Sequence, residues 1–279
     1  MISLSESNED INVISFFNNK TDLFFVDICG YKSNWFSNTF LLEDKYNWKG
    51  ICCQPFPVVF LKLKNHRKAE CYNYVISNKS DISLKFSRKQ LSTARNINPK
   101  VTPYIEINND KKKDNIGTIV KTITLQNFLN KYKASTLLHY LSINTTGSEI
   151  DILKSFDFSK YTFLYITVDN NNEETKKTEL KTLLSENGYL YKEKNNCNHN
   201  YIHETTLTGT YYYKEDYTKP IIIKRKNENE FLVTSSYWND DIGTFNNGFI
   251  EWKTNGKGEI FFSHIDYGNG HIWHRDTRN

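Results

Sequence analysis

The sequence predicts an α/β protein in which a mostly parallel sheet with helices on both faces precedes a small antiparallel, β-rich region. The first observation is that apolar runs typical of buried strands alternate with amphipathic segments between residues 23 and 188. This alternation indicates strand–helix–strand units with right-handed crossovers, which build parallel sheets. The second is a change near residue 209, after which short β-prone runs are separated by turn signals. We therefore expect two domains, residues 1–208 and residues 209–279.

Each element of the first domain is predicted by a local pattern. Apolar runs predict strands, and segments with apolar residues on one helical face predict helices. Pro57 precedes one helix, and Gly188 follows the last one at the position where a left-handed residue often ends a helix. The strands are expected at residues 23–28, 49–53, 71–76, 137–143 and 161–168, and the helices at residues 11–17, 37–46, 58–65, 124–131, 148–156 and 173–187.

Residues 77–119 interrupt this pattern. Charged residues, asparagines and two prolines, Pro99 and Pro103, leave no sustained period. Loops of this length are usually functional lids or solvated variable segments, and both alternatives stay open.

The second domain is expected to be an antiparallel meander or a small barrel. Residues 240–243 and the Asn-Gly pairs that begin at 255 and 269 are interpreted as turns between its strands. The strands are expected at residues 211–213, 221–224, 231–235, 248–252, 258–263 and 271–273.

Composition excludes several classes of protein. A chain of 279 residues can bury a core without a structural metal or disulfide. It has five cysteines, an odd number, and Cys52 and Cys53 are adjacent, which favours a reducing compartment. The net charge of +4 is small and the lysines are scattered, so nucleic-acid binding is not indicated. No apolar run approaches the roughly 18 residues of a membrane span, so we expect a soluble, cytoplasmic protein that does not bind membranes.

Two further inferences come from residue usage. The abundance of Asn, Lys, Ile and Tyr resembles the coding bias of an AT-rich genome, such as that of a large DNA virus or an AT-rich microbe; a viral protein would lie in the host cytoplasm or the virion. His139, His199, His203 and Cys197 do not have the spacing of a metal site, so no metal is expected. An oligomer is left open.

The stretch from Leu23 to Thr39 has the pattern of a ligand-binding turn. An apolar run ends at Asp27 and Ile28 and breaks into a turn with Gly30 and Tyr31. A parallel strand delivers such a loop to the carboxyl edge of its sheet, where open α/β sheets bind ligands, and glycine there leaves room for a cofactor. A buried core strand with an ordinary turn is the alternative.

Several motifs together resemble the FkbM family of S-adenosylmethionine-dependent methyltransferases. They occur in the family's order between residues 21 and 202 and read FFVDICGYKSNWFSNT, NWKGICCQPFPVVFLKLKNHR, TLQNFL, YLSINTTGSEIDIL and ITVDNNNEE. The resemblance implies a Rossmann-like methyltransferase fold with S-adenosylmethionine as cofactor. It also implies methyl transfer to a hydroxyl, often on a sugar or glycan.

The resemblance also implies roles for individual residues. Asp27, Gly30 and Tyr31 match the cofactor turn, and Ser37 and Asn38 match the signature that follows it. The residue that would bind the ribose hydroxyls is Gln54, where the family usually has Glu, and Asn144 and Thr146 stand where it usually has Asp and Glu. Methyl transfer to a hydroxyl needs a group that removes the proton, and the candidate catalytic residues are Glu149, Asp169 and Asn144.

The replaced acids leave a second interpretation open, a catalytically inactive methyltransferase fold used for binding or assembly. In that case the second domain is a candidate glycan- or protein-binding surface. Its aromatic residues could stack on sugar rings or could fill a β-domain core. They include Tyr237, Trp238, Trp252, Tyr267 and Trp273.

Overall fold

The structure is a computed structural model of the full chain. It describes residues 2–29, 36–87, 105–106, 117–145, 147–169, 174–195, 198–213, 217–227, 229–236, 240–253, 256–262, 264–267 and 272–275.

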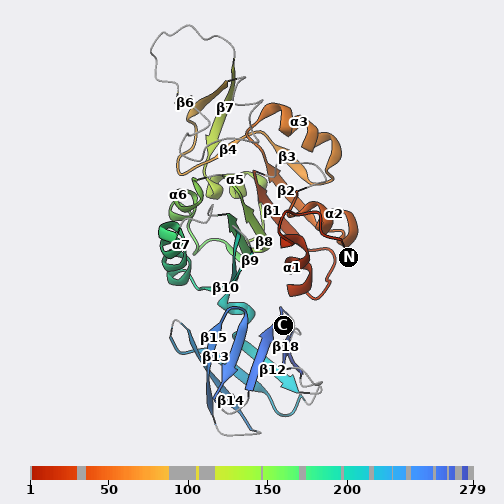
Figure 1. The fold of residues 1–279 in the computed structure, drawn as a ribbon, viewed down its shortest axis with the longest axis vertical. Coiled ribbons are helices and arrows are strands. Elements are labelled where there is room, and N and C mark those ends of the chain that lie inside the picture. The colour runs from red at the N-terminus through yellow and green to blue at the C-terminus, as the bar shows by residue number, and fades with distance from the viewer. Residues whose placement is uncertain are drawn as a thin grey trace.

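The centre of the molecule is a mostly parallel sheet (Figure 1), whose strands lie in the order β10-β11-β9-β8-β1-β2-β3. The five strands from β9 to β3 are parallel, and β11 and β10 form an antiparallel pair at one edge. The strands are β1 (Phe24–Ile28), β2 (Lys49–Cys53), β3 (Glu70–Tyr72), β8 (Leu137–Ile143), β9 (Thr162–Asp169), β10 (Tyr189–Asn195) and β11 (Asn198–His203).

Helices cover both faces of this sheet. Apolar residues of α1 and α2 belong to one core cluster, with Phe25, Tyr140 and Tyr165 of the strands. Apolar residues of α5, α6 and α7 belong to another, with Val26 and Ile166 from the opposite face. The helices are α1 (Glu9–Phe16), α2 (Phe40–Tyr46), α3 (Pro57–His66), α5 (Leu125–Tyr132), α6 (Glu149–Lys154) and α7 (Glu174–Glu186).

Local chemistry explains several helix ends. The Thr124 hydroxyl accepts a hydrogen bond from the Asn127 backbone amide at 3.1 Å and caps α5. Pro57 is the first residue of α3, where its missing N–H is not needed. Gly188 has φ +83° just beyond α7, as the sequence predicts.

Part of the segment at residues 77–119 is a β structure, which corrects the expectation of a segment without regular elements. β4 (Val75–Ile76), β5 (Ser83–Ser87), β6 (Ile105–Glu106) and β7 (Gly117–Ile123) form a small sheet in the order β4-β7-β5-β6. The strand expected at residues 71–76 is accordingly divided, because β3 joins the large sheet and β4 joins the small one. Residues 88–104 and 107–116, with Pro99 and Pro103, lie outside the described residues.

The C-terminal region is a closed antiparallel barrel, the second of the two expected alternatives. Residues 241–243 were expected in a turn but begin β15, and β18 had no predicted counterpart. A short 3₁₀ turn (Glu204–Thr206) leads into the barrel. The strands of the barrel are β12 (Gly209–Tyr213), β13 (Ile221–Arg225), β14 (Glu230–Ser235), β15 (Asp241–Asn246), β16 (Phe249–Trp252), β17 (Gly256–Ile260), β18 (His264–Asp266) and β19 (Ile272–Arg275).

Aromatic side chains fill the barrel. Trp252 and Trp273 are buried with ring centroids 6.1 Å apart, and the Trp252 indole donates a hydrogen bond to the Tyr267 hydroxyl. A Cβ atom on Gly243 would lie 2.2 Å from the Trp252 ring, so only glycine leaves room for it. Core packing, one of the two expected roles, is thus the role of Trp252 and Trp273; Tyr237 and Trp238 lie outside the described residues.

The barrel packs directly on the α1 side of the large sheet. The Phe262 backbone amide donates to the Phe16 carbonyl at 2.9 Å, and the Phe262 and Phe17 rings are 5.4 Å apart. Arg225 of β13 forms an ion pair with Glu204. The small sheet, the large sheet and the barrel follow one another along the long axis (Figure 1). No helix in the described part of the chain is long and apolar enough to cross a membrane.

Candidate functional site

The strand order reverses direction at β1, which pairs with β2 on one side and β8 on the other. In open α/β sheets this switch point is where ligands bind, beyond the carboxyl ends of the strands. Register partners on neighbouring strands point to the same face of a sheet. One such row of partners, just below the carboxyl edge, is mostly polar. It consists of Cys71, Cys52, Asp27, Ser142, Thr167 and Asn200.

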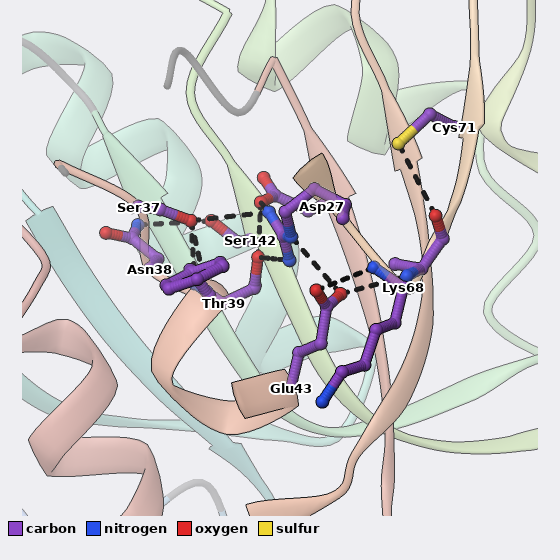
Figure 2. Close-up of polar contacts among 11 residues, drawn as sticks. Asp27, Ser37, Asn38, Thr39, Glu43, Lys68, Cys71 and Ser142 are labelled. Carbon is purple, nitrogen blue, oxygen red and sulfur yellow. Dashed lines mark hydrogen bonds and ion pairs between the residues drawn. The ribbon is translucent and has the colours of Figure 1, made fainter. Parts of the chain in front are cut away.

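Asp27 is buried and belongs to a charged network (Figure 2). Its carboxylate accepts a hydrogen bond from the Thr39 hydroxyl at 2.6 Å and lies 4.0 Å from the Arg67 guanidinium. Arg67 also donates to Thr39 and, through Nε at 3.2 Å, to Glu43. Burial raises the pKa of Asp27, and the charge of Arg67 and the Thr39 hydrogen bond oppose that shift.

Glu43 completes this network on the α2 side. Its carboxylate accepts from the backbone amides of Lys68 and Ala69 at 2.8 and 2.9 Å, in addition to Arg67. Two carboxylates and one guanidinium are therefore held together below the carboxyl edge, and they fix the start of α2 to β1 and to the segment before β3. Sequence reasoning missed Arg67; the available signal was that it is the first arginine of a lysine-rich chain.

Ser37 and Asn38 connect the loop before α2 to the sheet. The Ser37 hydroxyl accepts from the Phe40 backbone amide at 3.1 Å, which satisfies a free donor at the beginning of α2. The Asn38 side chain donates to the Ser142 hydroxyl of β8 at 3.1 Å (Figure 2). These two side chains therefore hold the loop before α2 in place against the helix and the sheet.

The turn after β1 begins with an unusual backbone conformation. Cys29 has φ +68°, a left-handed conformation that is rare for residues other than glycine. Burial, with the neighbouring Glu149 and Asp27 carboxylates, raises the pKa of the Cys29 thiol to about 12. The thiol is therefore protonated at neutral pH, which argues against a nucleophilic role. Gly30 and Tyr31, with the rest of the turn through residue 35, lie outside the described residues.

Gln54 directly follows the carboxyl end of β2 and is buried. Its side-chain oxygen accepts a hydrogen bond from the Phe56 backbone amide at 3.0 Å. The Asn73 side chain donates to the Gln54 carbonyl at 2.8 Å. The side chain is therefore fixed at the strand end where the resemblance expects the ribose-binding group.

Of the three candidate catalytic residues, Asn144 follows β8, Asp169 ends β9 and Glu149 begins α6, and their environments differ. The Glu149 carboxylate is buried and accepts hydrogen bonds from the Thr145 amide and hydroxyl and from the Gly147 amide, at 2.9 to 3.1 Å. Glu149 thus organises its own turn, in which Gly147 has φ +133°. Asn144 and Asp169 each follow by one residue the paired Ile143 and Val168, so they are neighbours at the edge.

The first turn of α1 brings two buried acids, Glu9 and Asp10, that the sequence did not indicate as site residues. The Glu9 carboxylate accepts from the Asn198 side chain of β11, and Asn198 is the register partner of Asp169. The Asp10 carboxylate accepts from the amides of Leu4 and Ser5. The only available signal was two acids before an apolar helical run, which suits a helix N-terminus but does not predict burial.

The segment before α1, residues 3–8, spans the site. Its Leu4 carbonyl accepts from the Ser37 backbone amide at 3.1 Å, and Glu9, the residue that follows the segment, contacts β11. It therefore connects the loop before α2 with the antiparallel edge of the sheet. We call residues 3–8 the N-terminal segment.

The three histidines that were considered as metal ligands each contact neighbouring protein groups. His139 accepts from the Phe24 backbone amide through Nδ1 at 3.2 Å, the His199 ring packs near Tyr191, and His203 contacts Thr205. Within the described residues, no group of three or more His, Cys, Asp and Glu side chains is arranged to hold a metal ion. Cys197 lies outside those residues.

Comparison with known protein families identifies a match to the methyltransferase FkbM domain over residues 27–191. The chain belongs to this family. The match extends from Asp27 at the end of β1 to the start of β10, and it therefore contains the whole carboxyl edge of β1, β2, β8 and β9. The barrel lies beyond the matched residues.

Comparison with solved structures finds two methyltransferases. The methyltransferase from Pyrococcus furiosus has 10% sequence identity and a TM-score of 0.35, covering 70% of this chain and 81% of that chain. The precorrin-6y C5,15-methyltransferase from Geobacter metallireducens GS-15 has 10% identity and a TM-score of 0.33, covering 72% and 90%. No curated protein matches the chain significantly.

Proposed function

We propose that this FkbM-family chain binds S-adenosylmethionine at the carboxyl edge of β1 and β2 and methylates a hydroxyl group of a sugar or glycan. The observation that carries the proposal is the convergence of polar side chains at the β1/β8 switch point within the matched family domain. The residues concerned are Gln54, Asn144 and Asp169 at the edge, above the network of Asp27 and Arg67.

The residues at this edge fit the cofactor. The Gln54 amide carries both an acceptor and a donor, so it can bind ribose hydroxyls without a carboxylate. Asp27 supports the site indirectly, since its carboxylate holds Thr39 and Arg67. S-adenosylmethionine, when bound, supplies an electrophilic methyl group on a sulfonium centre.

Asp169 is the residue that we assign as the base for the acceptor hydroxyl. It ends β9 beside Asn144, whose side chain can orient the acceptor, and its partner strand carries Asn198, which is held by Glu9. Glu149 is less suited to proton transfer, because its carboxylate already accepts several hydrogen bonds from its own turn. A positioned base contributes roughly 10²–10⁴-fold to such a step.

The test has a binding part and a catalytic part. Isothermal titration of the full chain with S-adenosylhomocysteine should give a micromolar dissociation constant, and labelled methyl groups from S-adenosylmethionine should appear on a member of a glycan panel. Asp169→Asn should lower the transfer rate about 100-fold or more and leave the dissociation constant unchanged. Asp157→Asn, at a surface turn, is the matched control.

The outcome separates this proposal from a second one. The neutral Gln54 and the internally bonded Glu149 favour an inactive fold that serves in binding or assembly. Absence of any binding heat with S-adenosylhomocysteine would support that alternative and contradict ours. Binding without transfer to any acceptor in the panel would contradict the proposed methylation of a glycan. Transfer by Asp169→Asn at the rate of the unsubstituted chain would contradict the assignment of Asp169.

A further inference from the structure

Cys52 and Cys71 lie opposite each other on neighbouring strands. They are register partners of the parallel strands β2 and β3, so their side chains point to the same face. Neighbouring strands are about 4.8 Å apart, which is within the usual range of about 4.4–6.8 Å between the Cα atoms of a disulfide. β3 is the edge strand of the sheet, and Cys71 is only partly buried, so a small oxidant can reach it.

The surroundings of the two thiols make one of them the more reactive. The neighbouring Cys52 thiol lowers the pKa of Cys71 and the Arg67 guanidinium lowers it further, whereas burial opposes both; the pKa of Cys52 is raised by Cys71 and by burial. When protonated, the Cys71 thiol donates a hydrogen bond to the Ala69 carbonyl at 3.5 Å. Burial raises the pKa values of Cys29 and Cys53. Among the cysteines that the structure describes, Cys71 therefore has the most thiolate character.

We propose that Cys52 and Cys71 form a redox-active dithiol, which a peroxide converts into a reversible disulfide between β2 and β3. This bond would tie the edge strand to β2, the strand that directly precedes Gln54, next to the Arg67 network. The inference does not rest on methyl transfer, because it needs only the two thiols and an oxidant.

The reaction has two balanced steps. The Cys71 thiolate attacks one peroxide oxygen, an S–O bond forms, the O–O bond breaks, and the leaving hydroxide takes a proton to become water. The Cys52 sulfur then loses its proton and attacks the Cys71 sulfenic acid, the S–S bond forms, and the S–O oxygen leaves as a second water. The two thiols lose two electrons, and hydrogen peroxide gains them.

The test uses the full chain, treated with hydrogen peroxide and then alkylated, digested with trypsin and analysed by mass spectrometry. We expect a loss of about 2 Da from the intact protein and one cross-linked peptide pair, residues 50–62 joined to residues 69–79. A reducing agent should restore both peptides. The Cys53→Ser variant should give the same cross-link, because Cys53 points to the opposite face in the other core cluster.

Three results would overturn the proposal. One is a cross-link that persists in Cys71→Ser, since it would join other cysteines. Another is oxidation of Cys71 to sulfinic or sulfonic acid without a cross-link in the unsubstituted chain. The last is a cross-link that forms only after unfolding in urea, because the folded register would then not be its cause.

Discussion

At the residue scale, the guanidinium of Arg67 is the buried cation between two buried carboxylates, those of Asp27 and Glu43. Removing one member of a buried charged group costs more than the group contributes when intact, because the remaining charges are left without compensation. Arg67→Met keeps much of the side-chain volume and removes the charge. We expect it to lower the free energy of unfolding by about 3–5 kcal/mol, measured by urea denaturation.

Lys64→Met is the matched control for this change. Lys64 is an exposed residue of α3, three positions before Arg67, so the same substitution there should alter stability by less than about 0.5 kcal/mol. Equal effects of the two substitutions would show that the Arg67 network does not support the fold.

His139 gives a prediction for pH. Burial lowers the pKa of His139, and the charge of Lys20 adds to the shift. His139 thus binds a proton less readily in the folded state than in the unfolded chain, where the pKa of histidine is about 6.5. The contribution of neutral His139 to the stability of the fold is present above this unfolded-state pKa. It is lost as the pH falls through the lower pKa of the folded state.

Stability against urea should therefore fall between pH 7 and pH 5 more steeply in the unsubstituted chain than in His139→Asn. Asparagine offers an acceptor oxygen for the Phe24 amide and does not titrate. Subtracting the two curves removes the contributions of His203 and His264, whose pKa values are also lowered by burial. Parallel curves would exclude His139 as a source of the pH dependence.

Sequence reasoning could locate residues at strand ends but not their partners. Gln54 and Asp169 were predicted at the edge because hydrophobic runs show where strands end. Arg67 and Glu9 are distant in sequence from the groups that they bind, and a charged residue before a strand or helix is ordinarily solvated. Burial of these charges is a property of the assembled fold, so the local sequence could not reveal it.

At the scale of elements, the N-terminal segment depends on Asp10 of α1. The Asp10 carboxylate accepts hydrogen bonds from the Leu4 and Ser5 amides and from the Ser5 hydroxyl, besides the Ile11 amide. In Asp10→Asn one of these acceptor oxygens becomes an NH₂ group, which cannot pair with donors. The expected cost is about 1–3 kcal/mol, and it is local to this segment.

Amide hydrogen exchange provides the measurement. Leu4 and Ser5 should exchange faster in Asp10→Asn, whereas strand β8 should keep its protection. Asp44→Asn on α2 is the control, because Asp44 is exposed and should leave both regions unchanged. Uniformly faster exchange in Asp10→Asn would mean that Asp10 supports the whole domain, contrary to this prediction.

The elements that were predicted poorly are those whose polar residues are buried by tertiary contacts. β11 contains Asn198, His199 and Asn200, all buried, and a polar run of this kind does not indicate a strand. β15 begins with a buried Asp241 and includes Gly243, both typical turn residues. There the packing of Trp252 requires glycine, so long-range contacts overrule the local turn preference.

At the scale of the whole molecule, one apolar cluster continues from the large sheet into the barrel. It includes Phe16 and Phe17 of the α1 region together with Phe231 and Trp252 of the barrel. When two regions share a core in this way, opening either one exposes apolar surface of the other. We therefore expect the full chain to unfold in a single calorimetric transition, with equal calorimetric and van't Hoff enthalpies.

Phe262 tests whether this shared contact causes the coupling. Its backbone amide bonds to Phe16 and its ring packs near Phe17, so Phe262→Ala removes apolar contact across the junction and leaves the barrel interior intact. The single transition should then broaden or divide into two. Tyr217→Ala, which truncates a mostly exposed ring on the barrel, should leave one transition. Two transitions already in the unsubstituted chain would show that the barrel and the sheet are thermodynamically independent, and that their common cluster buries too little surface to join them.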